Sequence, residues 1–254
     1  MSHWLSVAVP TPAHSGLAEP LTYRSDAPLP AGSIVRVPLG ARELLGVVWG
    51  AAASPDAALA PQVRALAGSF DGLAPLSADW LELIAFTARY YQRALGEVAL
   101  AALPPQLRTL DGVQLARRLK RQPPEGASPT VAPGHAALSA GQAEALARIE
   151  AEPGPFLLFG ATGSGKTEVY MQAVQRLLAR APEAQALVLV PEINLTPQLE
   201  ARFAARFGAA ACVSLHSGLT PAQRLAAWLA AHSGRARIVL GLSLIHISEP
   251  TRPY

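Results

Sequence analysis

The sequence is poor in the residues on which disulfide-bonded and cysteine-zinc proteins depend. Its 254 residues include a single cysteine, Cys212, which excludes an intrachain disulfide and a cysteine-cluster zinc site within this chain. Cys212 stands in an apolar run, and we therefore expect a buried, unreactive thiol. Only 15% of the residues are charged and 50% are hydrophobic, a composition that supports a substantial core and argues against global disorder.

Long apolar runs are missing as well. No stretch approaches the roughly 18 apolar residues of a membrane span, and residues 1–4 lack the basic and apolar segments of a secretory signal. We therefore expect a cytoplasmic location and no membrane partner. The net charge of +3 and the isoelectric point near 9.3 permit a polyanionic partner without requiring one.

The clearest chemistry lies in residues 160–167, which fit the phosphate-loop pattern G-x-x-x-x-G-K-[ST] without a mismatch. The predicted nucleotide-binding residues of this loop are Gly160, Ala161, Thr162, Gly163, Ser164, Gly165, Lys166 and Thr167. The glycines permit backbone angles that turn successive N–H groups toward one anion, and a helix N-terminus adds further donors. Lys166 would reach the β- and γ-phosphates, and the Thr167 hydroxyl would coordinate Mg²⁺.

The surroundings of this loop predict a parallel α/β sheet. The apolar run 156–159 indicates a buried strand before the loop, and residues 168–174 indicate a helix after it. Three further apolar strands alternate with helices that begin at proline, and ligands of such sheets bind at the carboxyl ends of the strands. These strands are expected at 187–190, 212–215 and 238–241.

Gln142 has two interpretations that the sequence leaves open. Ser139 and Gln142 have the spacing of a capping box, in which the glutamine bonds back to the N-cap amide. Alternatively, the side-chain amide of Gln142 reads an adenine edge, because it can donate and accept at once.

The first hundred residues predict a small barrel or sandwich followed by a helix. Short β-type runs occur at 4–9, 33–38, 44–49 and 62–66, separated by proline and glycine. Ser77 is the expected N-cap of the helix. The periodicity favours core positions for Trp80, Tyr90 and Tyr91, with base stacking as the alternative.

These motifs resemble the PriA replication-restart helicase family, also called primosomal protein N′. The similarity rests on GSGKTEVY at 163–170, LVPEINLTPQ at 189–198, HSGLT at 216–220, and RVPLG at 36–40 with GVV at 46–48. It covers nearly all of residues 1–241. It implies a small N-terminal β-rich DNA-binding domain followed by a truncated RecA-like helicase lobe with a phosphate loop.

The resemblance also implies an ATP- and Mg²⁺-dependent helicase that unwinds 3′ to 5′ at stalled forks and helps to reload the replicative helicase. Expected partners are forked and single-stranded DNA, primosome proteins and single-strand-binding proteins. Lys166 and Thr167 are the expected catalytic residues, and Gln142 joins the nucleotide site. The residues carried over as DNA contacts are Tyr23, Arg36, Gly40, Thr196, Gln198, His216 and Ser217.

Four segments follow from this resemblance. We expect a DNA-binding domain at 1–105 and a helicase lobe at 138–241. Residues 106–137 form a basic, proline-rich linker, which contacts phosphates or is a solvated helix end with a linker, and they leave too little room for a winged helix. Residues 242–254 resemble a translated sequencing adaptor, and we expect this tail to be non-native.

Three departures from the family pattern shape the expectations further. Leu21-Thr22-Tyr23 stands where the family has Phe-Asp-Tyr in its pocket for a DNA 3′ end. The family's acidic box, second motor lobe and arginine finger do not occur, so efficient ATP hydrolysis by this fragment is not expected. The family's zinc-binding cysteines are also missing, which restricts zinc to the C-terminal part of the family. Another phosphate-loop repair translocase and a non-enzymatic fork-binding module remain alternatives.

Overall fold

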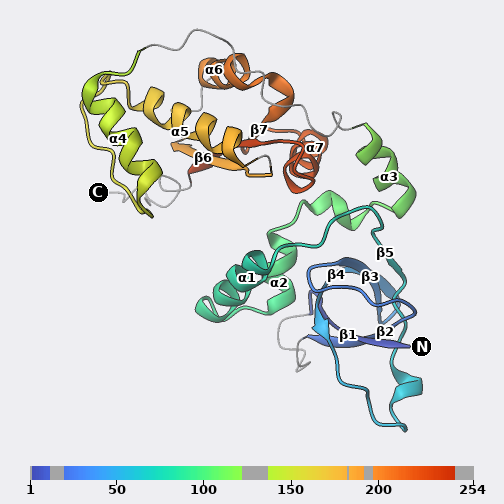
Figure 1. Ribbon diagram of the computed structural model, residues 1–254. Helices are drawn as coiled ribbons and strands as arrows, with labels where there is room; N and C mark the ends of the chain where they lie inside the picture. Colours follow the sequence, from blue (N-terminus) through green and yellow to red (C-terminus); the bar gives the residue numbers. More distant parts are fainter. Residues whose placement is uncertain (1, 12–19, 122–136, 182, 192–196, 244–254) are drawn as a thin grey trace, which may run out of the picture. The chain divides into compact units, whose positions relative to one another are not determined.

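The computed structural model describes residues 2–11, 20–121, 137–181, 183–191 and 197–243. It divides into two compact units, one of residues 1–121 with 221–226, the other of residues 122–220 with 227–254. One sheet is antiparallel and the other is parallel (Figure 1). The fold is therefore mixed α/β, as predicted at this level.

The antiparallel sheet has five strands in the order β2-β1-β4-β3-β5. Its strands are β1 (His3–Ala8), β2 (Leu21–Ser25), β3 (Ile34–Leu39), β4 (Arg42–Ala51) and β5 (Gly68–Ser69). The sheet curls until its edges approach (Figure 1), because Arg24 of the edge strand β2 bridges Ala65, shortly before the opposite edge strand β5. The predicted barrel-like N-terminal sheet is thus confirmed.

Alternation of side chains places the core inside this curl. Leu5 and Val7 of β1 pack against Val35 and Val37 of β3, together with the ring of Tyr23 from β2. Apolar residues at every second position of a strand share one face, which explains why these short runs signalled strands.

One predicted strand of this sheet was wrong, and two of its strands, β2 and the two-residue β5, were not predicted. Residues 62–66 form no strand: the 3₁₀ helix η1 (Ala60–Gln62) occupies the start of the run, and Ala65 makes only an isolated bridge. Pro61 explains part of this result, since proline has no N–H to donate and suits the first turn of a helix. β2 was not predicted, because its sequence LTYRS has only a brief alternation.

Four further helical segments of the first unit follow the sheet in the chain. They are α1 (Ala78–Tyr90), α2 (Leu95–Ala101), η2 (Pro105–Arg108) and α3 (Gly112–Lys120). The predicted cap of α1 is confirmed, because Ser77 Oγ accepts a hydrogen bond from the Trp80 amide at 3.2 Å. The basic residues of the predicted linker lie partly in α3. Residues 122–136 of the linker fall outside the described residues.

The prediction of core positions for the aromatics of α1 was wrong for two of them. Tyr90 and Tyr91 are 69% and 67% exposed, and only Ile84 and Ala88 of α1 are buried. Phe86 stacks on Tyr90 with ring centroids 5.8 Å apart, and Tyr91 meets Tyr90 edge-on at 5.0 Å. The helix packs through a narrower stripe than periodicity indicated, and its aromatic side chains gather on the exposed side.

The parallel sheet has the order β6-β8-β7. Its strands and the surrounding elements are α4 (Ala140–Ala151), α5 (Lys166–Arg180), β6 (Ala186–Pro191), α6 (Pro197–Phe207), η4 (Ala209–Ala211), β7 (Cys212–Leu215), α7 (Pro221–His232) and β8 (Ile238–Ser243). Met171 and Leu178 of α5, Phe203 and Phe207 of α6, and Ile238 of β8 belong to one buried cluster. As predicted, α6 and α7 begin at a proline.

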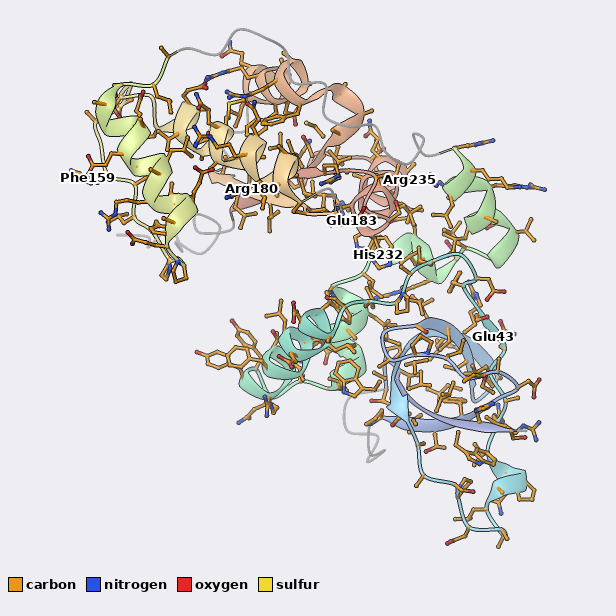
Figure 2. All side chains as sticks on the ribbon, viewed as in Figure 1. Glu43, Phe159, Arg180, Glu183, His232 and Arg235 are labelled. Carbon is orange, nitrogen blue, oxygen red and sulfur yellow. The ribbon has the colours of Figure 1, made fainter. Side chains whose placement is uncertain are left out.

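The expected strand before the phosphate loop does not form. Residues 156–159 have no strand assignment, and Leu157 and Phe159 are 90% and 92% exposed. Figure 2 shows the Phe159 side chain at the surface of its unit. A strand needs a neighbouring strand for its N–H and C=O groups, and within the described sheet neither β6 nor β7 pairs with this run. Apolar character alone could not supply that neighbour.

Gly96 gives a test of the packing between α2 and β1. A Cβ atom at Gly96 would lie 1.8 Å from the Val9 carbonyl oxygen, so backbone must move to admit it. We expect Gly96→Ala to lower the free energy of unfolding by about 1–3 kcal/mol, as overpacking does. Gly112→Ala in α3 is the matched control, because a Cβ there meets nothing within 4 Å. Equal denaturation midpoints for the two variants, followed by circular dichroism, would contradict this account.

Candidate nucleotide-binding site

The phosphate loop has the backbone that its glycines predicted. Gly163 and Gly165 have φ angles of +83° and +80°, in the left-handed region that side chains disfavour. At Gly160, an added Cβ would lie 2.8 Å from Ser164 Oγ. The loop ends where α5 begins, at Lys166, so the unpaired amides of the first helical turn open directly onto it.

Lys166 is folded back over the loop. Its Nζ donates hydrogen bonds to the Gly160 and Ala161 carbonyl oxygens, at 2.6 Å and 2.8 Å. Two of the three ammonium donors are therefore bonded to the backbone of the loop. When a phosphate binds, Lys166 would release these carbonyls and donate to the charged phosphate oxygens instead. Charged oxygens accept shorter and stronger hydrogen bonds from a lysine.

A cavity of about 660 Å³ adjoins the loop. This volume falls within the roughly 300–1,000 Å³ typical of small-molecule sites. The described residues lining it are Thr162, Gly163, Gly165, Lys166, Thr167, Glu168, Tyr170, Val190, Gln198, Leu199 and Arg202. The predicted metal ligand Thr167 thus faces the same space as Lys166. Gln198, predicted as a DNA contact, lies on the opposite wall in the first turn of α6.

Gln142 makes both the capping bond and a bond to the phosphate loop. Its Oε1 accepts from the Ser139 amide at 2.9 Å, and the Ser139 hydroxyl accepts from the Gln142 amide at 3.4 Å. Its Nε2 donates to the Ser164 carbonyl oxygen at 2.9 Å. The capping box is therefore confirmed, and the same side chain fixes α4 to the loop. Contact with an adenine stays a prediction.

The remaining predicted contacts of this unit lie near the carboxyl ends of the strands. His216 and Ser217 directly follow β7, and the Leu219 amide donates to the His216 carbonyl oxygen at 3.4 Å. Because β6 and β7 both run parallel to β8, this turn and the start of α6 lie at the same edge of the sheet. Thr196 falls outside the described residues.

The side chains that were predicted to contact DNA in the first unit make contacts within the protein. Tyr23 is only 3% exposed, and its hydroxyl donates to the Pro38 carbonyl oxygen at 3.2 Å. Burial raises the pKa of Tyr23, an effect that the Arg64 charge partly offsets. This leaves almost none of the ring accessible to a DNA end, and a role for Tyr23 in DNA binding stays a prediction.

Arg36 and Gly40 have structural roles in the same barrel. Arg36 Nη2 donates to the carbonyl oxygens of Arg108, at 3.1 Å, and of Leu110, and its guanidinium lies 5.8 Å from the centroid of Phe70. Gly40, with a φ of +61°, occupies the two-residue turn between β3 and β4. A role for either residue in contacting DNA remains untested.

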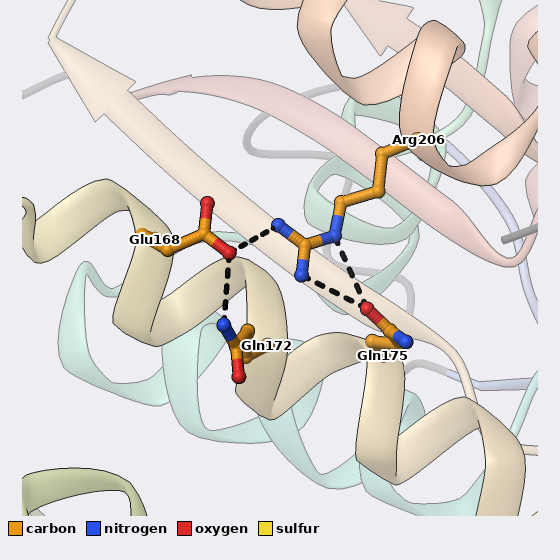
Figure 3. Close-up of polar contacts among 4 residues, drawn as sticks. All are labelled: Glu168, Gln172, Gln175 and Arg206. Atoms are coloured by element: carbon orange, nitrogen blue, oxygen red, sulfur yellow. Dashed lines mark hydrogen bonds and ion pairs between the residues drawn. The ribbon is translucent and has the colours of Figure 1, made fainter. Parts of the chain in front are cut away.

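Two charged residues near the loop were not predicted. Glu168 follows Thr167 in the first turn of α5, and its carboxylate pairs with Arg206 of α6 at 2.7 Å (Figure 3). Gln172 and Gln175, one and two turns further along α5, complete the cluster. The spacing of 168, 172 and 175 marks one helical face, a signal that sequence reading could have used. Their partner 38 residues away could not be read from it.

Other chemistry is limited in the described part of the chain. No group of three or more His, Cys, Asp or Glu side chains is placed there to hold a metal ion. Nor does any described helix have the length and apolarity needed to cross a bilayer. Burial raises the pKa of the Cys212 thiol to about 11, which agrees with the predicted unreactive cysteine.

Comparison with known proteins agrees with this division of the chain. Residues 6–104 match the family model of the PriA 3′DNA-binding domain, and residues 135–241 match that of the type III restriction enzyme res subunit. Replication restart protein PriA of Treponema pallidum is 32% identical over 252 residues, covering 95% of this chain and 36% of that protein. PriA of Bacillus subtilis is 49% identical over 86 residues, 34% of this chain and 10% of that protein.

The chain is similar to PriA proteins over most of its length. PriA of Rickettsia felis shows the same similarity, with 31% identity over 210 residues that cover 83% of this chain and 30% of the relative. The resemblance inferred from the motifs is therefore confirmed. The chain spans about a third or less of the length of these three PriA proteins.

Gln142 allows its two roles to be tested separately. Gln142→Glu keeps an acceptor for the Ser139 amide and loses the donor to the Ser164 carbonyl oxygen. We expect this variant to retain its thermal stability to within about 1 kcal/mol, the order of one neutral hydrogen bond, and to bind ATP·Mg²⁺ at least fivefold more weakly by isothermal titration calorimetry.

The control for this experiment is Gln114→Glu in α3. Gln114 and Asp111 form an equivalent capping box, in a helix of the other unit. We expect Gln114→Glu to leave nucleotide affinity unchanged. Equal affinities for both glutamate variants and the unmodified chain would show that the contact with Ser164 does not shape the loop.

Proposed function

We propose that this chain is the DNA-binding and nucleotide-binding part of an ATP-dependent DNA helicase of replication restart. The observation that carries the proposal is the cavity in which Lys166 and Thr167 meet a loop of left-handed glycines. The match of residues 6–104 to the PriA 3′DNA-binding domain supplies the biological setting, and the match of residues 135–241 to a helicase-type domain supports a motor lobe.

In this proposal ATP·Mg²⁺ binds with its phosphates on the loop. Lys166 leaves its backbone carbonyls for the β- and γ-phosphates, and the Thr167 hydroxyl binds Mg²⁺. The bound metal would neutralise phosphate charge. Gln142 is close enough to the loop to contribute to the nucleotide site, because its amide already reaches Ser164. The second unit would then be a truncated RecA-like helicase lobe, spanning residues 138–241.

The first unit is proposed to bind DNA over residues 1–105, with the basic linker at 106–137. Forked and single-stranded DNA are the proposed substrates, with unwinding 3′ to 5′ and reloading of the replicative helicase as the activity of the whole protein. Primosome proteins and single-strand-binding proteins are the proposed partners, in the cytoplasm. Backbone contacts from loops such as the His216 turn suit a motor, because stepping must ignore sequence.

A second candidate is a module that binds forks and nucleotide without hydrolysing ATP. Among the described residues lining the cavity, Glu168 is the only carboxylate, and it is paired with Arg206. Phosphoryl transfer requires groups that position the water and the metal, and the described lining residues include no second acidic side chain for these tasks. Phosphate release measured with fork DNA separates the candidates: turnover favours the helicase, and binding without turnover favours the module. A different phosphate-loop translocase is disfavoured by the PriA 3′DNA-binding match at 6–104.

Lys166 provides the test of nucleotide binding. We expect the 254-residue chain to bind ATP·Mg²⁺, and Lys166→Ala to bind at least tenfold more weakly, because the alanine removes the cation at the loop. Lys120→Ala is a matched control, since Lys120 is the other lysine of the sequence and lies exposed in the last turn of α3. Equal binding by the chain and Lys166→Ala, in calorimetric titrations, would refute the assignment.

The exposed aromatics of α1 provide a test of DNA binding. Stacking of a base on an aromatic side chain contributes about 1–3 kcal/mol. If Tyr90 and Tyr91 stack on bases, the double variant Tyr90→Ala/Tyr91→Ala binds oligothymidine at least fivefold more weakly in fluorescence anisotropy. Leu59→Ala is the control, because Leu59 is also an exposed apolar side chain of the first unit and has no aromatic ring to stack on a base. Unchanged affinity in the double variant would remove α1 from the DNA surface.

A further inference from the structure

The cavity beside the phosphate loop contains an acidic side chain where a phosphate chain is proposed to bind. Glu168 lines the cavity directly after Lys166 and Thr167, in the first turn of α5. A carboxylate in the same cavity as bound phosphates would repel them, since repulsion between like charges is strong where water is partly excluded. The following inference rests on the proposed nucleotide binding and concerns how the protein controls this charge.

Arg206 is placed to control it. Its side chain comes from the last turn of α6 and is only 8% exposed. Nη1 donates to Glu168 Oε1 at 2.7 Å, while Nε and Nη2 both donate to Gln175 Oε1, at 3.2 Å and 2.9 Å (Figure 3). Gln172 Nε2 donates to the same Glu168 oxygen at 3.0 Å. One oxygen of the carboxylate thus accepts from two donors, Arg206 of α6 and Gln172 of α5, and the charged donor is the one from α6.

A mechanical role alone does not require this arginine. The two helices already meet through aromatic side chains, because Tyr170 of α5 stacks on Phe203 of α6. Burying a guanidinium is costly unless it is paired and hydrogen-bonded. An apolar residue at position 206 would pack between the helices without that cost. The feature that an apolar residue could not supply is a positive charge against Glu168.

We propose that Arg206 is a positioning residue for nucleotide binding, which holds the Glu168 carboxylate toward α6 and cancels its charge at the phosphate-loop cavity. Arg206 itself touches no phosphate in this account. It acts through Glu168, and its removal leaves this carboxylate in the wall of the site without its ion pair. The expected effect is therefore specific to anionic ligands and depends on Glu168 being present.

A double-mutant cycle on the full chain tests this dependence. ATP·Mg²⁺ affinity is measured by calorimetry for Arg206→Leu, Glu168→Gln and the double variant. We expect Arg206→Leu to weaken binding at least tenfold, Glu168→Gln to bind as tightly as the unmodified chain or more tightly, and the double variant to recover most of the loss. A simple clamp between α5 and α6 predicts weaker binding in all three variants with no recovery, and that result would overturn the proposal.

Two further measurements keep the test decisive. Raising the salt concentration from 50 mM to about 500 mM should shrink the loss in Arg206→Leu, because salt screens the lone carboxylate, and a packing defect would not respond. Arg206→Lys keeps the charge without the two bonds to Gln175, and we expect affinity within threefold of the unmodified chain. If Arg206→Leu does not fold, weaker binding by a folded Glu168→Gln contradicts the proposal by itself.

Lys166→Ala distinguishes failure of this inference from failure of the proposed function. If the unmodified chain and Lys166→Ala bind ATP equally, the nucleotide site is wrong and Arg206 has nothing to position. If Lys166→Ala loses affinity and Arg206→Leu, shown to be folded, binds like the unmodified chain, the nucleotide site stands and the role of Arg206 is refuted.

Discussion

The phosphate loop of the second unit depends on a glycine at position 165. Its positive φ turns the chain from the phosphate loop into α5, and a Cβ there would lie 2.3 Å from Gln142 Nε2. The same close approach lets Gln142 bond to the Ser164 carbonyl oxygen while capping α4. Because Gly165 has no side chain, α4 can pack against the phosphate loop at the point where α5 begins.

Charge at the start of α5 is arranged around this join. Lys166 is held by two carbonyls of the loop, and Glu168 is held by Arg206 from α6. Each charged side chain that flanks Thr167 therefore has a partner within the protein. A phosphate would compete with the two loop carbonyls for Lys166, and the Glu168 carboxylate near it is already paired with Arg206. The site is arranged to accept negative charge although one of its own walls is acidic.

The sequence predicted those parts of the site that are encoded locally. Glycine spacing implied the left-handed positions at 163 and 165, and the Ser139–Gln142 pair implied the cap, because both features depend on residues within one turn. The strand at 156–159 failed because pairing depends on a distant neighbour. The contact between Gln142 and Ser164, and that between Glu168 and Arg206, escaped for the same reason: each joins segments more than twenty residues apart. Tyr23 was recognised by its motif position, but its burial depends on the whole curled sheet.

The sheet of the second unit has unlike faces. α5 and α6 cover the face formed by Ile238 and Leu240, whereas Leu187 and Leu189 of β6 remain largely exposed. Parallel sheets normally have helices over both faces, and an uncovered apolar stripe associates with any similar surface. The chain by itself should therefore self-associate as its concentration rises. Binding measurements on it are best made at low concentration, where such association does not imitate the uptake of a ligand.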